Sequence, residues 1–168
     1  MILLKIVDVR DKPKNGFIYF DEIKKIKSYK DRQLAIASKQ LKNGVERKFF
    51  SISHSWPFCI LVESDKKIGI DIENMWRKIN YSKIYRKKIN PNSCYISREG
   101  FFKEWTMREA YYKFSQDVNY LKANIQDIRS LNWTICVIEE RFIISVCTSD
   151  EYVDEIMWKY IKVDQRTD

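Results

Sequence analysis

Asp71 and Glu73 are the pair of residues in this chain whose types and spacing most directly suggest chemistry. They lie two residues apart in KIGIDIE at residues 67–73, a run that is otherwise largely apolar. In a β-strand this spacing places both carboxylates on one face, while Ile70 and Ile72 point to the opposite face and into a core. Two carboxylates on one face repel each other, and such a pair usually persists because a cation lies between them. The pair predicts a metal site; the alternative is an exposed strand face with two solvated acids.

A third acid follows in a segment with a helical pattern. Glu109 and Lys113 are one helical turn apart and share a face, in the orientation that favours an ion pair. On an exposed surface such a pair would contribute only ~0.3–0.5 kcal/mol. Trp105 and the aromatic residues around it predict a buried helix, which would desolvate the pair. Together with Asp71 and Glu73, these residues suggest a magnesium site that acts on phosphate.

His54 is the only histidine in the chain, and it lies between Ser53 and Ser55 at the end of a β-rich run. A lone histidine is more often a hydrogen-bonded structural residue than a catalyst. Two hydroxyls, an imidazole and backbone N–H groups at the end of a strand nevertheless suit a phosphate. A serine nucleophile is disfavoured, because the chain has no Gly-x-Ser-x-Gly elbow. The segment is therefore a candidate phosphate site.

The elements that must position these residues alternate between strands and helices. Strands are predicted over residues 1–9, 49–52, 58–62, 68–73, 131–139 and 140–148, with a short apolar segment at 17–20. Helices are predicted over residues 30–42, from about Ser97 through Tyr112, and over residues 151–160. The order strand, helix, hairpin, followed by helix and hairpin again, indicates two similar halves that meet near residues 64–70. A cleft between packed halves is a common ligand site.

Length and composition narrow the class of protein. With 168 residues, 45% of them hydrophobic, the chain fits one globular domain and not a disordered segment. The formal net charge of +8 favours an anionic partner, which could be nucleic acid, a phosphate-rich small molecule or an acidic protein. The four cysteines are scattered without a CxxC pair, and neither a secretory signal nor a membrane-length apolar run occurs. A cytoplasmic, reduced protein is therefore expected.

Three segments occur in the order and approximate spacing of the motifs of the 4′-phosphopantetheinyl transferase superfamily. They are SISHS at residues 51–55, IGIDIE at 68–73 and WTMREAYYK at 105–113. The chain most resembles the surfactin-synthetase type, in which two pseudo-symmetric α/β halves are joined. The resemblance is specific from about Phe49 to Lys113 and only topological outside that range. It implies an α/β (α+β) fold of two pseudo-twofold-related half-domains, each a small, mainly antiparallel sheet packed on a long helix.

The resemblance also implies different tasks for the two halves of one compact unit. Residues 1–67 would form an N-terminal half on the side of the coenzyme A nucleotide. Residues 68–168 would form a C-terminal half that carries the magnesium and catalytic side. Three acids match the family's ligands of Mg²⁺, which Mn²⁺ could replace: Asp71, Glu73 and Glu109.

Individual side chains take their expected roles from the same motifs. Glu109 also matches the candidate general base, and Lys113 matches the lysine that stabilises charge on the phosphate. The positions expected to contact coenzyme A, chiefly its 3′-phosphate, are Ser53, His54, Arg32 and Lys48. The family usually has a glycine-containing turn after the helix lysine, whereas this chain reads FSQD at residues 114–117.

The implied activity is transfer of 4′-phosphopantetheine from coenzyme A to a serine of an apo acyl or peptidyl carrier protein. It would depend on magnesium and release adenosine 3′,5′-bisphosphate. Carrier proteins of this kind are acidic, which suits the positive charge of the chain. No nucleic-acid or membrane partner is expected, and the protein is expected to act as a monomer. Two alternatives stay open: a catalytically silent homologue that binds coenzyme A or the carrier, and a metal-dependent nuclease that uses the strand acids on a basic surface.

Overall fold

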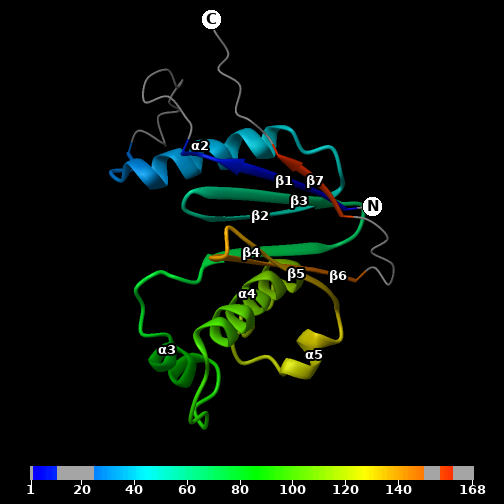
Figure 1. The fold of residues 1–168 in the computed structure, drawn as a ribbon. Helices are drawn as coiled ribbons and strands as arrows, with labels where there is room; N and C mark the ends of the chain where they lie inside the picture. The colour runs from blue at the N-terminus through cyan, green and yellow to red at the C-terminus, as the bar shows by residue number, and fades with distance from the viewer. Residues whose placement is uncertain (1, 11–24, 150–155, 161–168) are drawn as a thin grey trace, which may run out of the picture.

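The computed structural model describes residues 2–10, 25–149 and 156–160 (Figure 1). Its elements are β1 (Ile2–Asp8), α2 (Tyr29–Asn43), β2 (Phe49–Ser55), β3 (Phe58–Ser64), β4 (Ile68–Asn74), α3 (Tyr81–Lys88), α4 (Arg98–Ser115), α5 (Ile125–Arg129), β5 (Asn132–Ile138), β6 (Phe142–Thr148) and β7 (Ile156–Tyr160). The apolar segment predicted at residues 17–20 lies outside the described residues. Within the described residues, no helix is both long enough and apolar enough to span a membrane.

Two small sheets form the centre of the fold. The first has the strand order β2-β3-β1-β7, in which β7 runs parallel to β1 and the other pairs are antiparallel. The second has the order β4-β6-β5 and is antiparallel throughout. The sheets lie between α2, which covers the outer side of the first sheet, and α4, which covers the outer side of the second (Figure 1). The predicted α+β class, with two mainly antiparallel sheets and a long helix on each, is confirmed.

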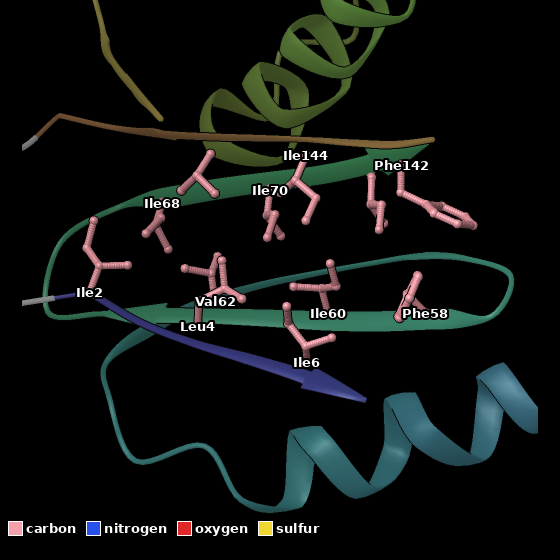
Figure 2. Packing of buried hydrophobic residues seen from close by; sticks show 12 residues of the cluster. Ile2, Leu4, Ile6, Phe58, Ile60, Val62, Ile68, Ile70, Phe142 and Ile144 are labelled. Atoms are coloured by element: carbon pink, nitrogen blue, oxygen red, sulfur yellow. The ribbon is translucent and has the colours of Figure 1, made fainter. Parts of the chain in front are cut away.

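The space between the two sheets is filled by aliphatic side chains from alternate positions of the facing strands. In Figure 2, Leu4, Ile60 and Val62 from the first sheet point toward Ile70 and Ile144 from the second. These side chains are almost completely removed from solvent. At about 25 cal/mol per Å² of buried apolar surface, such a cluster is the main force that holds one sheet against the other. Because strand side chains alternate, the odd-numbered residues of β4 face the opposite way, toward α4.

Both long helices begin at a serine cap. Ser28 accepts a hydrogen bond from the backbone N–H of Asp31, and Ser97 accepts one from the N–H of Gly100. Such a cap satisfies one of the N–H groups that the first turn of a helix leaves free. Helix α4 ends at Ser115, and its C-cap residue Gln116 adopts a left-handed conformation with φ of 62°. That conformation is usually taken by glycine.

The end of the described chain departs from the expected structure. A helix was predicted over residues 151–160, and this prediction is wrong for residues 156–160, which form β7 and pair with β1; residues 151–155 lie outside the described residues. A five-residue pattern is too short to separate helix from strand, and pairing with the free edge of β1 satisfies the backbone groups of β7. The chain therefore returns to the first sheet after the strands of the second. Helices α3 and α5 were not predicted.

Candidate functional site

Strand β4 packs unusually close to helix α4, and Gly69 makes this approach possible. A Cβ atom at residue 69 would lie 2.0 Å from the carbonyl oxygen of Ala110 and 2.9 Å from the backbone nitrogen of Phe114. No side chain fits there, since both atoms belong to the backbone of α4. The close approach brings the face of β4 that carries Asp71 and Glu73 against α4. The two-residue spacing had predicted only that both acids share one face of the strand.

Asp71 is the most constrained acid of the site. Its Oδ1 accepts hydrogen bonds from the hydroxyl of Ser53 at 2.7 Å and from the ammonium of Lys113 at 2.9 Å. Lys113 also donates to the carbonyl oxygen of Ile70 at 2.9 Å. The lysine thus pairs with the strand acid and not with Glu109, the partner predicted from helical spacing. The other oxygen, Oδ2 of Asp71, is buried and finds no hydrogen-bond partner among the described residues.

Glu73 lies next to Asp71 on the same face and is only half-buried by comparison. Its carboxylate is paired with the guanidinium of Arg77 at 3.1 Å. Burial raises the pKa of Glu73 to about 7; Arg77 opposes this shift, whereas the charges of Asp71 and Glu109 add to it. The charges of Asp71 and Glu109 therefore disfavour ionisation of Glu73.

Glu109 approaches the same region from α4. One of its oxygens accepts a hydrogen bond from the hydroxyl of Tyr120 at 2.8 Å. Burial raises the pKa of Glu109, the hydrogen bond from Tyr120 lowers it, and the charge of Asp71 raises it further. Tyr120 was not identified from the sequence, because it follows the motif helix in an irregular segment with no pattern that marks it.

The serines of β2 join the edges of the two sheets, a role that was not predicted from the sequence. Their hydroxyl oxygens accept hydrogen bonds from backbone N–H groups at the edge of β4: Ser51 from Ile70 (3.1 Å), Ser53 from Ile72 (3.4 Å) and Ser55 from Asn74 (3.1 Å). The two edge strands of different sheets are thus joined through side chains, which covers an edge that would otherwise be open. The signal was present in the sequence, since three serines at every second position place three hydroxyls on one face of a strand.

The residues expected to contact coenzyme A are spread over several elements. Ser53 is buried beside Asp71, whereas His54 points to the opposite side of β2 and is exposed. By strand alternation His54 shares a face with Ile52, which packs against the cluster under α2. Arg32 lies in the first turn of α2, and Lys48 is exposed just before β2, with its ammonium 5.3 Å from the ring centroid of Phe49. The structure therefore brings Ser53 to the acids and places His54 on the α2 side.

The carboxylates of the site are the candidate ligands of a metal ion. In the parts of the chain that the structure describes, no three carboxylate, imidazole or thiol side chains are already grouped as metal ligands. The chemistry of the set nevertheless suits a hard cation, because it consists of carboxylate oxygens and includes the unpartnered, buried Oδ2 of Asp71. A buried oxygen without a hydrogen-bond partner is costly unless something binds it. Asp71, Glu73 and Glu109 are the side chains that would hold the ion.

Comparisons with known proteins do not identify the chain. No protein-family model matches it, and no curated protein matches its sequence. The site itself combines three mutually repelling carboxylates with one ammonium group, at the seam where β4 meets both α4 and β2.

Proposed function

We propose that this protein is a 4′-phosphopantetheinyl transferase that modifies a serine of an acidic acyl or peptidyl carrier protein. The observation that carries the proposal is that the two sequence motifs face each other: Lys113 of α4 bonds to Asp71 of β4, and the charges of Asp71 and Glu109 act on Glu73. Three acids with a lysine suit a magnesium-bound diphosphate. The two mainly antiparallel sheets with their long helices support the same family assignment.

In the proposed reaction, Mg²⁺ held by the three acids would neutralise charge on the diphosphate of coenzyme A. Glu109 accepts the proton of the carrier serine as the serine oxygen bonds to the β-phosphorus. The phosphoanhydride bond breaks, and adenosine 3′,5′-bisphosphate leaves with the electron pair. The ammonium of Lys113, fixed by Asp71 and the carbonyl of Ile70, lies ready to stabilise negative charge on the phosphates.

On the nucleotide side, the proposal assigns the 3′-phosphate of coenzyme A to the side chains of His54, Arg32 and Lys48. Ser53 contributes from β2 by donating its hydroxyl hydrogen to Asp71 and so fixing that carboxylate. The net charge of +8 supports an acidic carrier as the second substrate, because complementary charge speeds the encounter of two proteins.

The deciding experiment incubates the protein with magnesium, coenzyme A and a panel of apo carrier proteins, and follows the carrier mass by mass spectrometry. We expect one phosphopantetheine adduct per carrier and its loss on removal of magnesium. Asp71→Asn and Glu109→Gln should each abolish transfer, whereas Asp65→Asn should not, because Asp65 is an exposed acid in the turn before β4. Coenzyme A binding without any adduct would refute catalysis and favour a silent homologue. Cleavage of DNA or RNA under the same conditions would favour a nuclease.

A further inference from the structure

Arg108 forms a buried polar centre next to the proposed site. Only 4% of the residue is exposed, and its guanidinium uses all of its donor atoms. Nε and Nη2 donate to Oε1 of Glu104 at 3.0 and 2.8 Å, and Glu104 also accepts from the hydroxyl of Tyr85 at 2.9 Å. Nη1 donates to three backbone carbonyls of the segment after α4, those of Tyr120 (3.2 Å), Leu121 (3.2 Å) and Ala123 (2.9 Å).

These bonds fix a segment that has little regular structure of its own. Residues 116–124 contain turns but no helix or strand, and they leave α4 through the left-handed Gln116. A planar guanidinium presents its donors in a rigid fork and can hold several carbonyl groups in one fixed geometry, whereas the three donors of a lysine lie at the end of a flexible chain. Arg108 therefore determines where the backbone of Tyr120 lies.

Tyr120 connects this segment to the site. Its hydroxyl donates to Oε1 of Glu109 at 2.8 Å, and its ring packs against that of Tyr112 with the centroids 4.9 Å apart. One oxygen of Glu109 is thereby engaged, so its second oxygen is the one left for the cation or for the proton of the carrier serine. A carboxylate held in this way loses little conformational freedom when it binds the cation or accepts the proton.

We propose that Arg108 and Tyr120 are positioning residues for Glu109: Arg108 fixes the 116–124 segment, and Tyr120 orients the carboxylate. This inference rests on the proposed transferase function. A purely structural role would lower the stability of the protein without changing the turnover of the folded enzyme. The two roles are therefore separated by kcat, by KM and by local hydrogen exchange.

The first test compares Tyr120→Phe with Tyr95→Phe in the 168-residue protein. Each variant removes one tyrosine hydroxyl, but Tyr120 donates to Glu109, whereas Tyr95 is 83% exposed and lies outside the contacts of Arg108. We expect Tyr120→Phe to lower kcat about ten- to a hundredfold, as for the loss of a hydrogen bond to a charged group, with KM for coenzyme A and carrier nearly unchanged. Tyr95→Phe should leave kcat within about twofold of the wild type.

The second test uses the metal-free protein and needs no activity. Arg108→Lys should speed amide hydrogen exchange in residues 116–124 about tenfold or more, whereas the exposed Arg86→Lys should not. Normal kcat in Tyr120→Phe, or unchanged exchange in folded Arg108→Lys, would overturn the positioning role. If the wild type itself transfers nothing to any carrier, the proposed function fails, and the positioning role is overturned with it. A wild type that transfers beside a fully active Tyr120→Phe would overturn the positioning role alone.

Discussion

Replacement of Gly69 by alanine tests the central geometric feature of the site. The new Cβ would lie 2.0 Å from the carbonyl oxygen of Ala110, whereas an ordinary contact needs at least 3.4 Å, so β4 and α4 must separate locally by about 1.4 Å. No change of rotamer can relieve this contact, because the clashing atoms belong to the backbone of α4. Overpacking in a core costs ~1–3 kcal/mol, and a clash between two rigid elements belongs at or above the upper end of that range.

The same displacement should lower activity as well as stability. Asp71 lies two residues beyond Gly69, and its bond to Lys113 spans the interface that the alanine would open. A misplacement of about 1 Å can lower a rate ~100-fold. We therefore expect Gly69→Ala to lose ~3 kcal/mol of unfolding free energy and about two orders of magnitude in transfer rate.

Urea unfolding followed by tryptophan fluorescence measures the first quantity, and the carrier mass assay measures the second. The matched control is Gly44→Ala at the end of α2, where the nearest atom would lie 3.8 Å from the new Cβ and φ is −103°. The control should remain within ~0.5 kcal/mol of the wild type, as surface substitutions usually do. If Gly69→Ala is as stable and as active as Gly44→Ala, the close packing of β4 on α4 is refuted.

Two further predictions concern stability. Burial alone would raise the pKa of the fully buried Glu63, but Lys5 and the backbone N–H groups of Glu46 and Arg47 lower it. The ionised carboxylate therefore stabilises the fold above pH ~4.3, and this contribution is lost as the pH falls through the lowered pKa. In urea titrations near pH 7, Glu63→Gln should lower the free energy of unfolding by ~3 kcal/mol. The difference in unfolding free energy between this variant and the wild type should shrink as the pH falls, and a difference independent of pH would contradict the assignment. Glu140 has φ of 53° in the β5–β6 turn, a conformation that glycine adopts without strain. Glu140→Gly should therefore raise the unfolding free energy by ~1 kcal/mol in thermal melts, and a lowered melting temperature would count against this prediction.

The alternation of side chains along a strand predicted on which face each residue lies, but it did not predict which distant residues each side chain contacts. Alternation along residues 68–73 correctly placed Asp71 and Glu73 on one face, since that pattern depends only on the pleat. Glu109 and Lys113 lie one turn apart on a helix, as predicted. Lys113, however, forms its ion pair with Asp71 on a strand 42 residues away in the sequence. Such a contact depends on how closely β4 and α4 approach, which one glycine decides. The bonds of Tyr120 and the pairing of β7 with β1 likewise depend on long-range packing and leave no local pattern.

Strand β4 has contacts on both faces and along its free edge that fix its register relative to the neighbouring strands. Its even-numbered residues fill the core between the sheets, its odd-numbered residues face α4, and its free edge donates N–H groups to the serines of β2. A shift by one residue would turn the isoleucines toward α4 and bury the carboxylates between two apolar sheets. The cost of burying unpaired charge there would far exceed the gain from any new contact. The features that fix the register of β4 are thus the same ones that hold Asp71 against Lys113, so the fold and the proposed site are specified together.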